Sequence, residues 1–164
     1  MNTFDLDLIN NIRDLLLEKG QTVAVAESVT SGHLQLALSL ADQASSYFQG
    51  GITAYNIGQK SRHLHIDPIH GEQVNCVSRQ IAQQMADHVC YIFTAYWGLG
   101  ITGYATKVPE QGINELFAYY AISKNGRTLA HGKITAGEDA APMEVRYYFT
   151  NQLLSHFVNV IVSP

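Results

Sequence analysis

The chain contains 164 residues, of which 46% are hydrophobic and 15% are charged. This length and composition predict one domain, residues 1–164, with a sizeable core, and exclude a disordered chain or a disulfide scaffold. The formal charge is −4 and no basic run is present, so no nucleic-acid partner is expected, because phosphate neutralisation needs a positive surface.

The start of the chain and its cysteines bear on where the protein works. The first residues lack the basic and apolar regions of a signal peptide, and no stretch approaches the ~18–20 apolar residues of a membrane span. Cys76 and Cys90 are too far apart for a zinc or C-x-x-C motif. We therefore expect a cytoplasmic protein that is not bound to a membrane. The low charged fraction favours a homo-oligomer that hides further surface.

The first part of the chain reads as helix, strand and helix. Leucine and isoleucine recur at helical spacing over about 5–19, and Gly20 is expected to end that helix. Residues 22–26 are short, apolar and β-branched, as in a buried strand. A small polar turn, 27–32, then leads into a helix that extends to about Asp42.

A second strand and two further helices follow. Gly50 and Gly51 are expected to open a strand that includes residues 52–55, and Asn56 can cap a short helix. Residues 65–77 are expected to be irregular. Ser78 then precedes a strong amphipathic helix, which extends to about Ile92.

The last part of the chain predicts three strands. Residues 95–103 form a Gly-punctuated apolar run, expected to be a central strand, and 104–113 is expected to be a loop. Strands over 116–122 and 128–135 flank Asn125-Gly126, a pair that tolerates positive φ at both positions of a hairpin turn.

A final helix is expected over about 140–160. With it, the order of elements predicts a three-layer α/β/α sandwich around a mixed, mostly parallel sheet of about five strands.

The turn at 27–32 is the first candidate site. In open α/β sheets, ligands bind at the carboxyl ends of strands, near helix N-termini. The hydroxyls of Ser28, Thr30 and Ser31 would lie at such a crevice. Thr30 or Ser31 could equally serve as the helix N-cap.

The segment around Tyr55 and Lys60 is the second candidate. A serine and a lysine can form a nucleophile and base if the lysine is desolvated enough to lose its proton. Tyr55 could then donate a hydrogen bond. The alternative is an exposed Lys60 on a helix and a Tyr55 that points its hydroxyl to water.

Three histidines, His63, His65 and His70, lie close together in the sequence. Their spacing does not match H-E-x-x-H, and no acidic ligand pattern accompanies them. We expect solvated side chains here and no metal site.

Several ordered motifs resemble the CinA C-terminal domain family, the nicotinamide-nucleotide amidases. The segment 26–32 is similar to the family's A-E-S-C-T-G-G, and 45–56 is similar to S-S-x-Y-F-x-G-G-V-x-A-Y-S/N. Lys60 aligns with the lysine of N-E-A-K. Residues 101–103 match its T-G, and 144–146 resemble its x-V-R.

This resemblance implies an α/β/α domain that hydrolyses the carboxamide of nicotinamide mononucleotide to nicotinate mononucleotide and ammonia. It places the catalytic serine on Ser28, the tyrosine on Tyr55 and the lysine on Lys60. It implies no metal or organic cofactor, a small-molecule nucleotide as partner, and a dimer or larger oligomer. The implied substrate-binding residues are Thr30, Ser31, Gly32, Thr102, Gly103 and Arg146.

The chain departs from the family pattern in three places. Val29 stands where the family has Cys, Ser31 replaces a Gly, and 104–112 replaces a Gly-rich loop. The alternative function is therefore a CinA-like domain without catalysis that binds nucleotides or serves as an interaction module.

Overall fold

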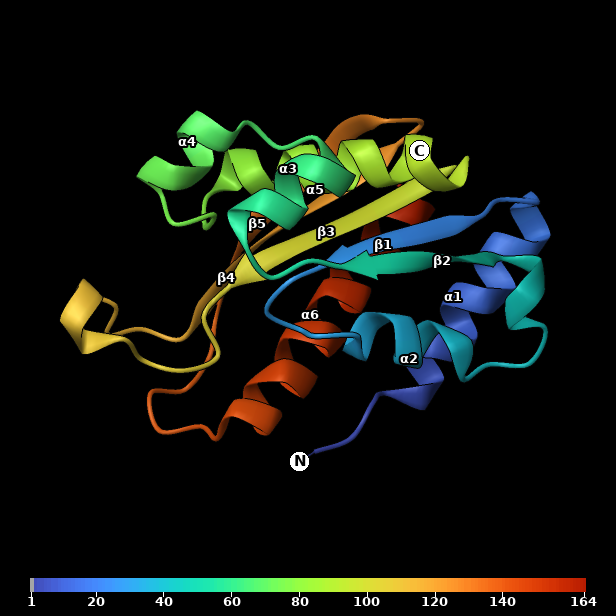
Figure 1. The fold of residues 1–164 in the computed structure, drawn as a ribbon. Coiled ribbons are helices and arrows are strands. Elements are labelled where there is room, and N and C mark those ends of the chain that lie inside the picture. Colours follow the sequence, from blue (N-terminus) through green and yellow to red (C-terminus); the bar gives the residue numbers. More distant parts are fainter. Residues whose placement is uncertain (1) are drawn as a thin grey trace.

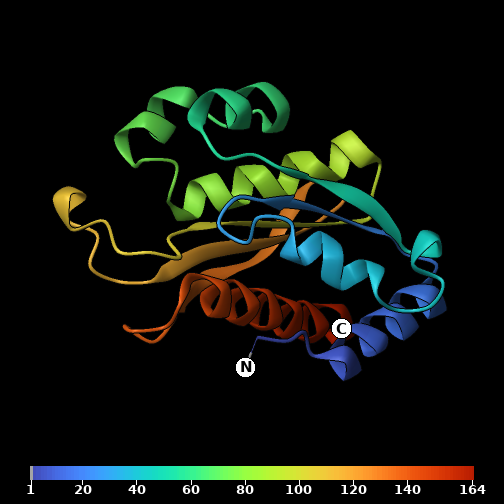
Figure 2. The same cartoon turned by 60° about the horizontal axis from the view of Figure 1, so that its bottom comes forward.

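A five-stranded mixed sheet lies between two layers of helices in the computed structural model, which describes residues 2–164 (Figures 1 and 2). The strand order is β2-β1-β3-β4-β5. Strand β1 pairs in parallel with β2 and β3, whereas β4 is antiparallel to both β3 and β5. Only β4 therefore opposes the common direction. The strands are β1 (Val23–Glu27), β2 (Phe48–Thr53), β3 (Trp97–Gly103), β4 (Phe117–Lys124) and β5 (Arg127–Thr135).

The helices divide between the two faces of the sheet. One layer contains α1 (Leu6–Lys19), α2 (His33–Ser39) and α6 (Pro142–Val162), and the other contains α3 (Ile57–Leu64), α4 (Pro68–Gln73) and α5 (Arg79–Phe93). Two 3-10 turns, Ala44–Ser46 and Pro109–Gln111, complete the elements. The predicted three-layer sandwich is confirmed.

Strand β1 explains why both faces must be covered. All five of its residues are buried. Because successive side chains alternate between faces, Val23 and Val25 join the core with α1, α2 and α6, whereas Ala24 and Ala26 join the core with α5. Branched side chains fill the first layer, and small ones let α5 approach on the second.

Glycines in β3 allow this close approach of α5. A Cβ on Gly98 would lie 2.2 Å from the carbonyl oxygen of Ala86, and one on Gly100 would lie 2.5 Å from that of Ala82. Both contacts are with helix backbone, which cannot move aside as a flexible side chain can. The glycines predicted for this central strand therefore bring strand and helix into backbone contact.

Local sequence signals end and begin several elements where they were predicted. Gly20 closes α1 with a left-handed φ of 62°. The side chains of Asn56 and Ser78 cap α3 and α5, accepting from Gln59 N and Ile81 N. The turn at Asn125-Gly126 has φ angles of 52° and 78°, which joins β4 to β5.

Three predicted boundaries were wrong. The segment expected to be irregular contains α4, which starts with Pro68 in the first turn and Asp67 as N-cap. Its six residues are too few to give a periodic pattern. Strand β2 spans Phe48–Thr53, so it begins before the glycines and ends before Tyr55. Helix α2 ends at Ser39, short of Asp42.

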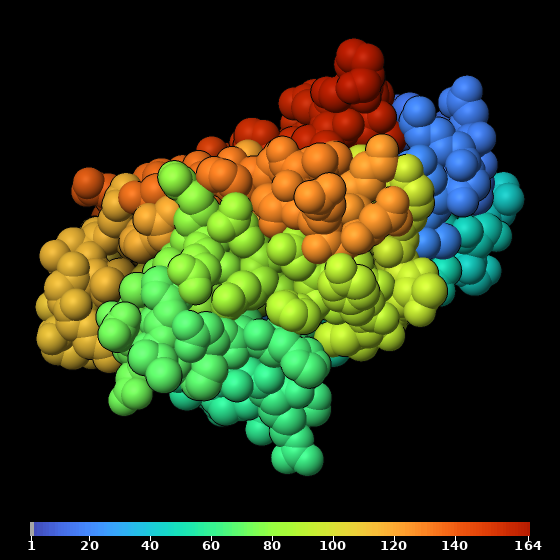
Figure 3. Space-filling model, turned by 90° about the horizontal axis from the view of Figure 1, so that it is seen from above, coloured from blue at the N-terminus to red at the C-terminus, as the bar shows by residue number. Residues whose placement is uncertain are grey.

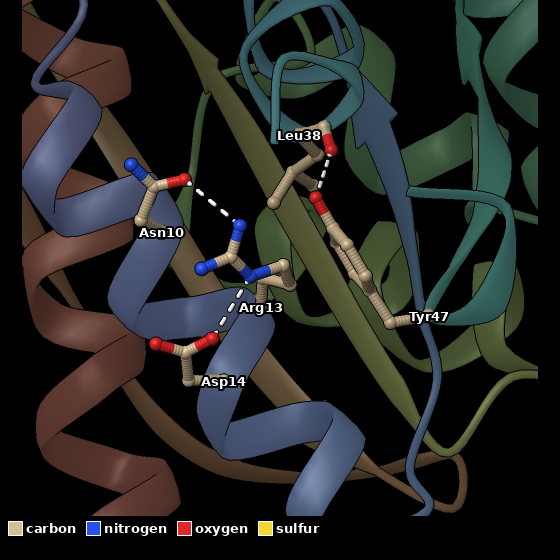
Figure 4. Close-up of polar contacts among 5 residues, drawn as sticks. All are labelled: Asn10, Arg13, Asp14, Leu38 and Tyr47. Atoms are coloured by element: carbon tan, nitrogen blue, oxygen red, sulfur yellow. Dashed lines mark hydrogen bonds and ion pairs between the residues drawn. The ribbon is translucent and has the colours of Figure 1, made fainter. Parts of the chain in front are cut away.

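A buried tyrosine fixes the connection from α2 to β2 (Figure 4). The Tyr47 hydroxyl donates to the carbonyl oxygen of Leu38, and burial raises the pKa of Tyr47. On neighbouring α1, Arg13 donates to Asp14 (2.9 Å) and Asn10 (3.3 Å). The Tyr47 bond ties the end of α2 to the start of β2, whereas the Arg13 contacts stay within α1.

The face on the α5 side is only partly covered by helices (Figure 3). Helix α5 lies over its centre, with α3 and α4 on one side of it and β5 on the other, at the edge of the sheet. Within residues 2–164, no helix has both the length and the apolar character needed to cross a membrane.

Candidate active site

The candidate residues meet at the carboxyl ends of β1 and β2, where both arrows point in Figure 1. Ser28 directly follows β1, and Tyr55 and Lys60 follow β2. The Ser28 N–H donates to the carbonyl oxygen of Ile101 (3.2 Å), and Ala54 N–H donates to that of Glu27 (2.9 Å). These backbone hydrogen bonds between neighbouring strands fix the position of the Ser28 backbone and of the segment that leads to Tyr55.

Ser28 and Lys60 form a direct pair. Lys60 Nζ lies 3.0 Å from Ser28 Oγ and 3.3 Å from the carbonyl oxygen of Tyr55. The lysine side chain is only 2% exposed, although 32 residues separate it from the serine. The first turn of α3, capped by Asn56, aims Lys60 back under the end of the sheet.

The surroundings of Lys60 favour its neutral form. Burial lowers the pKa of Lys60, and the nearby Cys76 thiol opposes that shift only in part. Among residues 2–164, the ion pairs are Arg13–Asp14 and Lys133–Glu115, so no carboxylate holds the proton on Lys60. The alternative of a solvated helix lysine was wrong. A buried amine beside a serine hydroxyl is the arrangement that a general base requires.

The turn that carries Ser28 is held by Glu27, a residue that sequence reasoning missed. This buried carboxylate accepts bonds from Thr30 Oγ1 (2.5 Å), Leu34 N (2.9 Å), and both Gln35 N and Gln35 Nε2 (3.0 Å each). Glu27 therefore satisfies two of the free N–H groups at the start of α2, those of Leu34 and Gln35. A glutamate that ends an apolar strand just before a polar turn was the signal available in the sequence.

Neither Thr30 nor Ser31 is the N-cap of α2, contrary to the alternative stated for them. The N-cap is Gly32, with φ 97° and no side-chain cap. The Thr30 side chain is fully buried and its hydroxyl is bound to Glu27. Thr30 therefore stabilises the turn through its buried hydrogen bond to Glu27.

Ser31 instead reaches across to Tyr55. Its φ of 56° is left-handed, and its Oγ lies 2.7 Å from the Tyr55 hydroxyl. Tyr55 is 58% exposed, so its hydroxyl is near water and near the turn at once. The structure thus brings four predicted residues, Ser28, Ser31, Tyr55 and Lys60, into one connected group.

A cavity of about 220 Å³ opens beside this group. Arg146, from α6, lines it, and Arg146 Nε donates to the carbonyl oxygen of Val29 (3.1 Å). Thr102 and Gly103 also line it, but Thr102 Oγ1 donates to the carbonyl oxygen of Cys76 (2.7 Å). The Arg146 bond uses Nε, which leaves the two Nη groups available to an anion.

The cavity rim contains a further residue that the sequence did not single out, Asn75. Its amide donates to the Tyr104 hydroxyl (3.1 Å) and to Gln111 Oε1 (3.3 Å), which ties the 104–113 loop to the turn before α5. Asn75 and Tyr55 also line an adjoining cavity of about 450 Å³. The 104–113 loop is therefore fastened at the edge of the site.

The three histidines point to different partners. His63 bonds to Gln59 (2.9 Å), His70 bonds to Ser78 (2.9 Å), and His65 stacks on His88. Among the described residues, no three metal-ligating side chains gather in one place.

A larger cavity, of about 500 Å³, lies at the other end of the sheet. Thr22, Thr94 and Asn125 contribute to its lining, and none of its lining residues is charged. Because that cavity holds no nucleophile with a base, the chemistry favours the smaller one.

Comparison with known proteins identifies the family of the chain. The family profile described as "CinA C-terminal domain" matches residues 5–150. This chain belongs to the CinA C-terminal domain family. A "CinA-like protein" from a Synechocystis species is 34% identical to this CinA domain over 145 residues, which is 87% of this chain and 34% of the relative. Another from Rippkaea orientalis is 41% identical over 101 residues, 62% of this chain and 24% of the relative.

Solved structures agree with the fold of this CinA domain. A competence or damage-inducible protein from Enterobacter asburiae aligns with a TM-score of 0.87 and 21% identity, over 97% of this chain and 99% of the other. The competence/damage inducible protein CihA from Agrobacterium tumefaciens aligns with a TM-score of 0.83 and 23% identity, over 98% and 99%. The chain spans about a quarter to a third of the two curated relatives and nearly all of these two solved chains.

Proposed function

We propose that this CinA domain is an amidohydrolase that converts nicotinamide mononucleotide to nicotinate mononucleotide and ammonia. The observation that carries the proposal is the 3.0 Å contact between Ser28 Oγ and the buried Nζ of Lys60. A lysine with a lowered pKa beside a serine hydroxyl is suited to nucleophilic attack on an amide.

The two side chains can complete the reaction without a cofactor. Neutral Lys60 takes the proton of Ser28 Oγ as this oxygen attacks the amide carbon, and the carbonyl electrons move onto oxygen. Collapse of this adduct breaks the C–N bond, Lys60 returns the proton to the leaving nitrogen, and ammonia departs. Water, deprotonated by Lys60, then cleaves the ester, and Ser28 regains its proton.

The carbonyl of Tyr55 sets the direction of the Lys60 amine. A neutral amine has two N–H donors and one lone pair. When one N–H donates to this carbonyl (3.3 Å), the lone pair can face the Ser28 hydroxyl. A fixed lone pair removes the rotational freedom that would otherwise oppose proton transfer.

Arg146 supports a phosphate-bearing substrate. At the start of α2, Leu34 N and Gln35 N already donate to the Glu27 carboxylate, so these donors are not available to a second anion. The guanidinium of Arg146 offers two Nη groups in the cavity, and such groups bind phosphate in a bidentate manner. The two adjoining cavities together reach the roughly 300–1,000 Å³ typical of small-molecule sites.

The test is ammonia release from nicotinamide mononucleotide by the purified chain, compared with Ser28→Ala. We expect turnover by the wild type and a loss of about 10³-fold or more in the variant, because the nucleophile is removed. Ser39→Ala is the matched control, since Ser39 is exposed and, among the described residues, its hydroxyl bonds only to the Leu36 carbonyl of its own helix. This control should keep wild-type turnover.

A folded wild type that releases no ammonia would overturn the proposed reaction. Calorimetry with the same nucleotide would then separate the two remaining cases. Binding without turnover would support the alternative of a nucleotide-binding module, whereas no binding would exclude this nucleotide as a ligand.

A further inference from the structure

A closed ring of contacts joins Ser28, Lys60, Tyr55 and Ser31 beside the candidate site. Ser28 Oγ contacts Lys60 Nζ, which contacts the carbonyl of Tyr55; the hydroxyl of Tyr55 contacts Ser31 Oγ; and Ser31 N donates to the carbonyl of Ser28 (3.1 Å). Tyr55 is thus held at both ends, through its backbone by Lys60 and through its hydroxyl by Ser31.

The contact with Ser31 matters because Tyr55 has little else to hold its ring. Its side chain is more than half exposed, and the hydroxyl bonds to Ser31 alone among residues 2–164. Tyr55 lines both the cavity beside Ser28 and the adjoining one. An exposed ring without this bond would gain rotamer freedom and turn toward water.

Ser31 provides this bond at a cost to the fold. Its φ of 56° is in the left-handed region, where a Cβ is disfavoured and glycine is not. Ser31 is itself exposed, so crowding does not dictate the choice of side chain at this position. What serine provides here, and glycine would not, is the hydroxyl that contacts Tyr55.

We propose that Ser31 is a positioning residue that fixes the ring of Tyr55 over the substrate cavity. The proposal rests on the amidohydrolase function proposed above, and it replaces the expectation that Ser31 binds substrate directly. Ser31 acts through Tyr55, which forms the wall shared by the two cavities and confines the carboxamide near Ser28.

The proposal predicts opposite changes in stability and activity for Ser31→Gly. The melting temperature should rise by about 2–4 °C as the left-handed strain is relieved, while kcat/KM for nicotinamide mononucleotide should fall about fivefold, as expected for one lost neutral hydrogen bond. Ser31→Ala should show the same fall in kcat/KM without the rise in melting temperature. A residue with a merely structural role would change both quantities in the same direction.

Gln43→Gly is the matched control. Gln43 has a left-handed φ of 62° and precedes the 3-10 turn at Ala44–Ser46, away from the site. Its replacement by glycine should raise the melting temperature in the same way and leave kcat/KM unchanged. A fall in kcat/KM here would overturn the link between activity and the Ser31 hydroxyl.

A double-mutant cycle with Tyr55→Phe tests whether the Ser31 hydroxyl acts through the Tyr55 hydroxyl. Ser31→Ala should lower kcat/KM in the wild type and should have no further effect when the Tyr55 hydroxyl is already absent. Wild-type kcat/KM in Ser31→Ala, or an equal fall in both backgrounds, would overturn the proposal.

A crystal structure of Ser31→Ala separates this proposal from the proposed function. If the wild type releases no ammonia, the proposed reaction fails, and the position of the Tyr55 ring then decides the matter alone. A ring turned away from the cavity supports positioning by Ser31. A ring in the same place overturns it, whatever the protein catalyses.

Discussion

Replacement of Lys60 by methionine tests whether the buried amine is neutral at working pH. Methionine is also unbranched, so it can follow the path of the buried lysine side chain, but it carries no charge and makes neither contact of Nζ. The loss of two hydrogen bonds should cost about 1 kcal/mol each. The desolvation of an ammonium, which the wild type bears at low pH, is removed at the same time.

The sign of the pH dependence follows from the lowered pKa of Lys60. The pKa is 10.5 before the effect of folding and lower in the folded state. Between these two values the unfolded chain holds a proton that the folded chain lacks, so wild-type stability rises with pH. For one proton the slope is about 1.4 kcal/mol per pH unit. Below the lowered pKa the full cost is present and the slope vanishes.

Urea unfolding at successive pH values measures this slope. The advantage of Lys60→Met over the wild type should be greatest at the acidic end and should decline as pH rises toward 10.5. Trp97, the single tryptophan and a buried one, reports unfolding in both. Lys19→Met, which removes an exposed lysine, should leave the slope as in the wild type. Parallel curves for Lys60→Met and the wild type would refute the claim that burial lowers this pKa.

The same variant tests the role of Lys60 in catalysis. Loss of a general base should lower ammonia release by about 10²–10⁴-fold. In the wild type, kcat/KM should rise with pH and level off above a pKa that is lower than 10.5, because only the neutral amine can accept the Ser28 proton. Wild-type activity in Lys60→Met would exclude the proposed base.

Two further variants test the anion site and the packing of the sheet. Arg146→Gln should raise KM for nicotinamide mononucleotide at least about tenfold, because charged hydrogen bonds contribute about 1.5–3 kcal/mol, and should leave KM for the nucleoside that lacks the phosphate unchanged; equal effects on both substrates would contradict phosphate binding. Gly98→Ala should lower the free energy of unfolding by about 3 kcal/mol or more, because its Cβ would lie 2.2 Å from the Ala86 carbonyl oxygen. Gly137→Ala, where a Cβ meets nothing within 4 Å, is the control in urea unfolding, and equal losses in the two variants would refute the close-packing argument.

The sequence by itself was sufficient for elements whose signals are local. The caps Asn56 and Ser78, the stop at Gly20 and the turn at Asn125-Gly126 each act within a few residues, so pattern and backbone preference identified them. Helix α4 shows the limit of periodicity, since six residues cannot reveal a face. Its N-cap, Asp67, followed by proline, was a usable sign that the periodicity argument passed over.

The site needed the tertiary structure, because its contacts join distant parts of the chain. The sequence offered Ser28 and Lys60 as a possible pair and left open a solvated lysine. Only the parallel pairing of β1 with β2 places them 3.0 Å apart, and only burial lowers the pKa of the amine. The bond from Arg146 to Val29 spans 117 residues.

The turn at 27–32 shows the same division at close range. Its polar residues identified it as a candidate from the sequence alone, but their roles depended on which donors the fold had already used. Glu27 accepts from two N–H groups at the start of α2 and from the Thr30 hydroxyl, and Ser31 faces Tyr55 instead. Residue type and spacing predict that a turn can do chemistry; the hydrogen bonds available after folding decide which of its atoms do it.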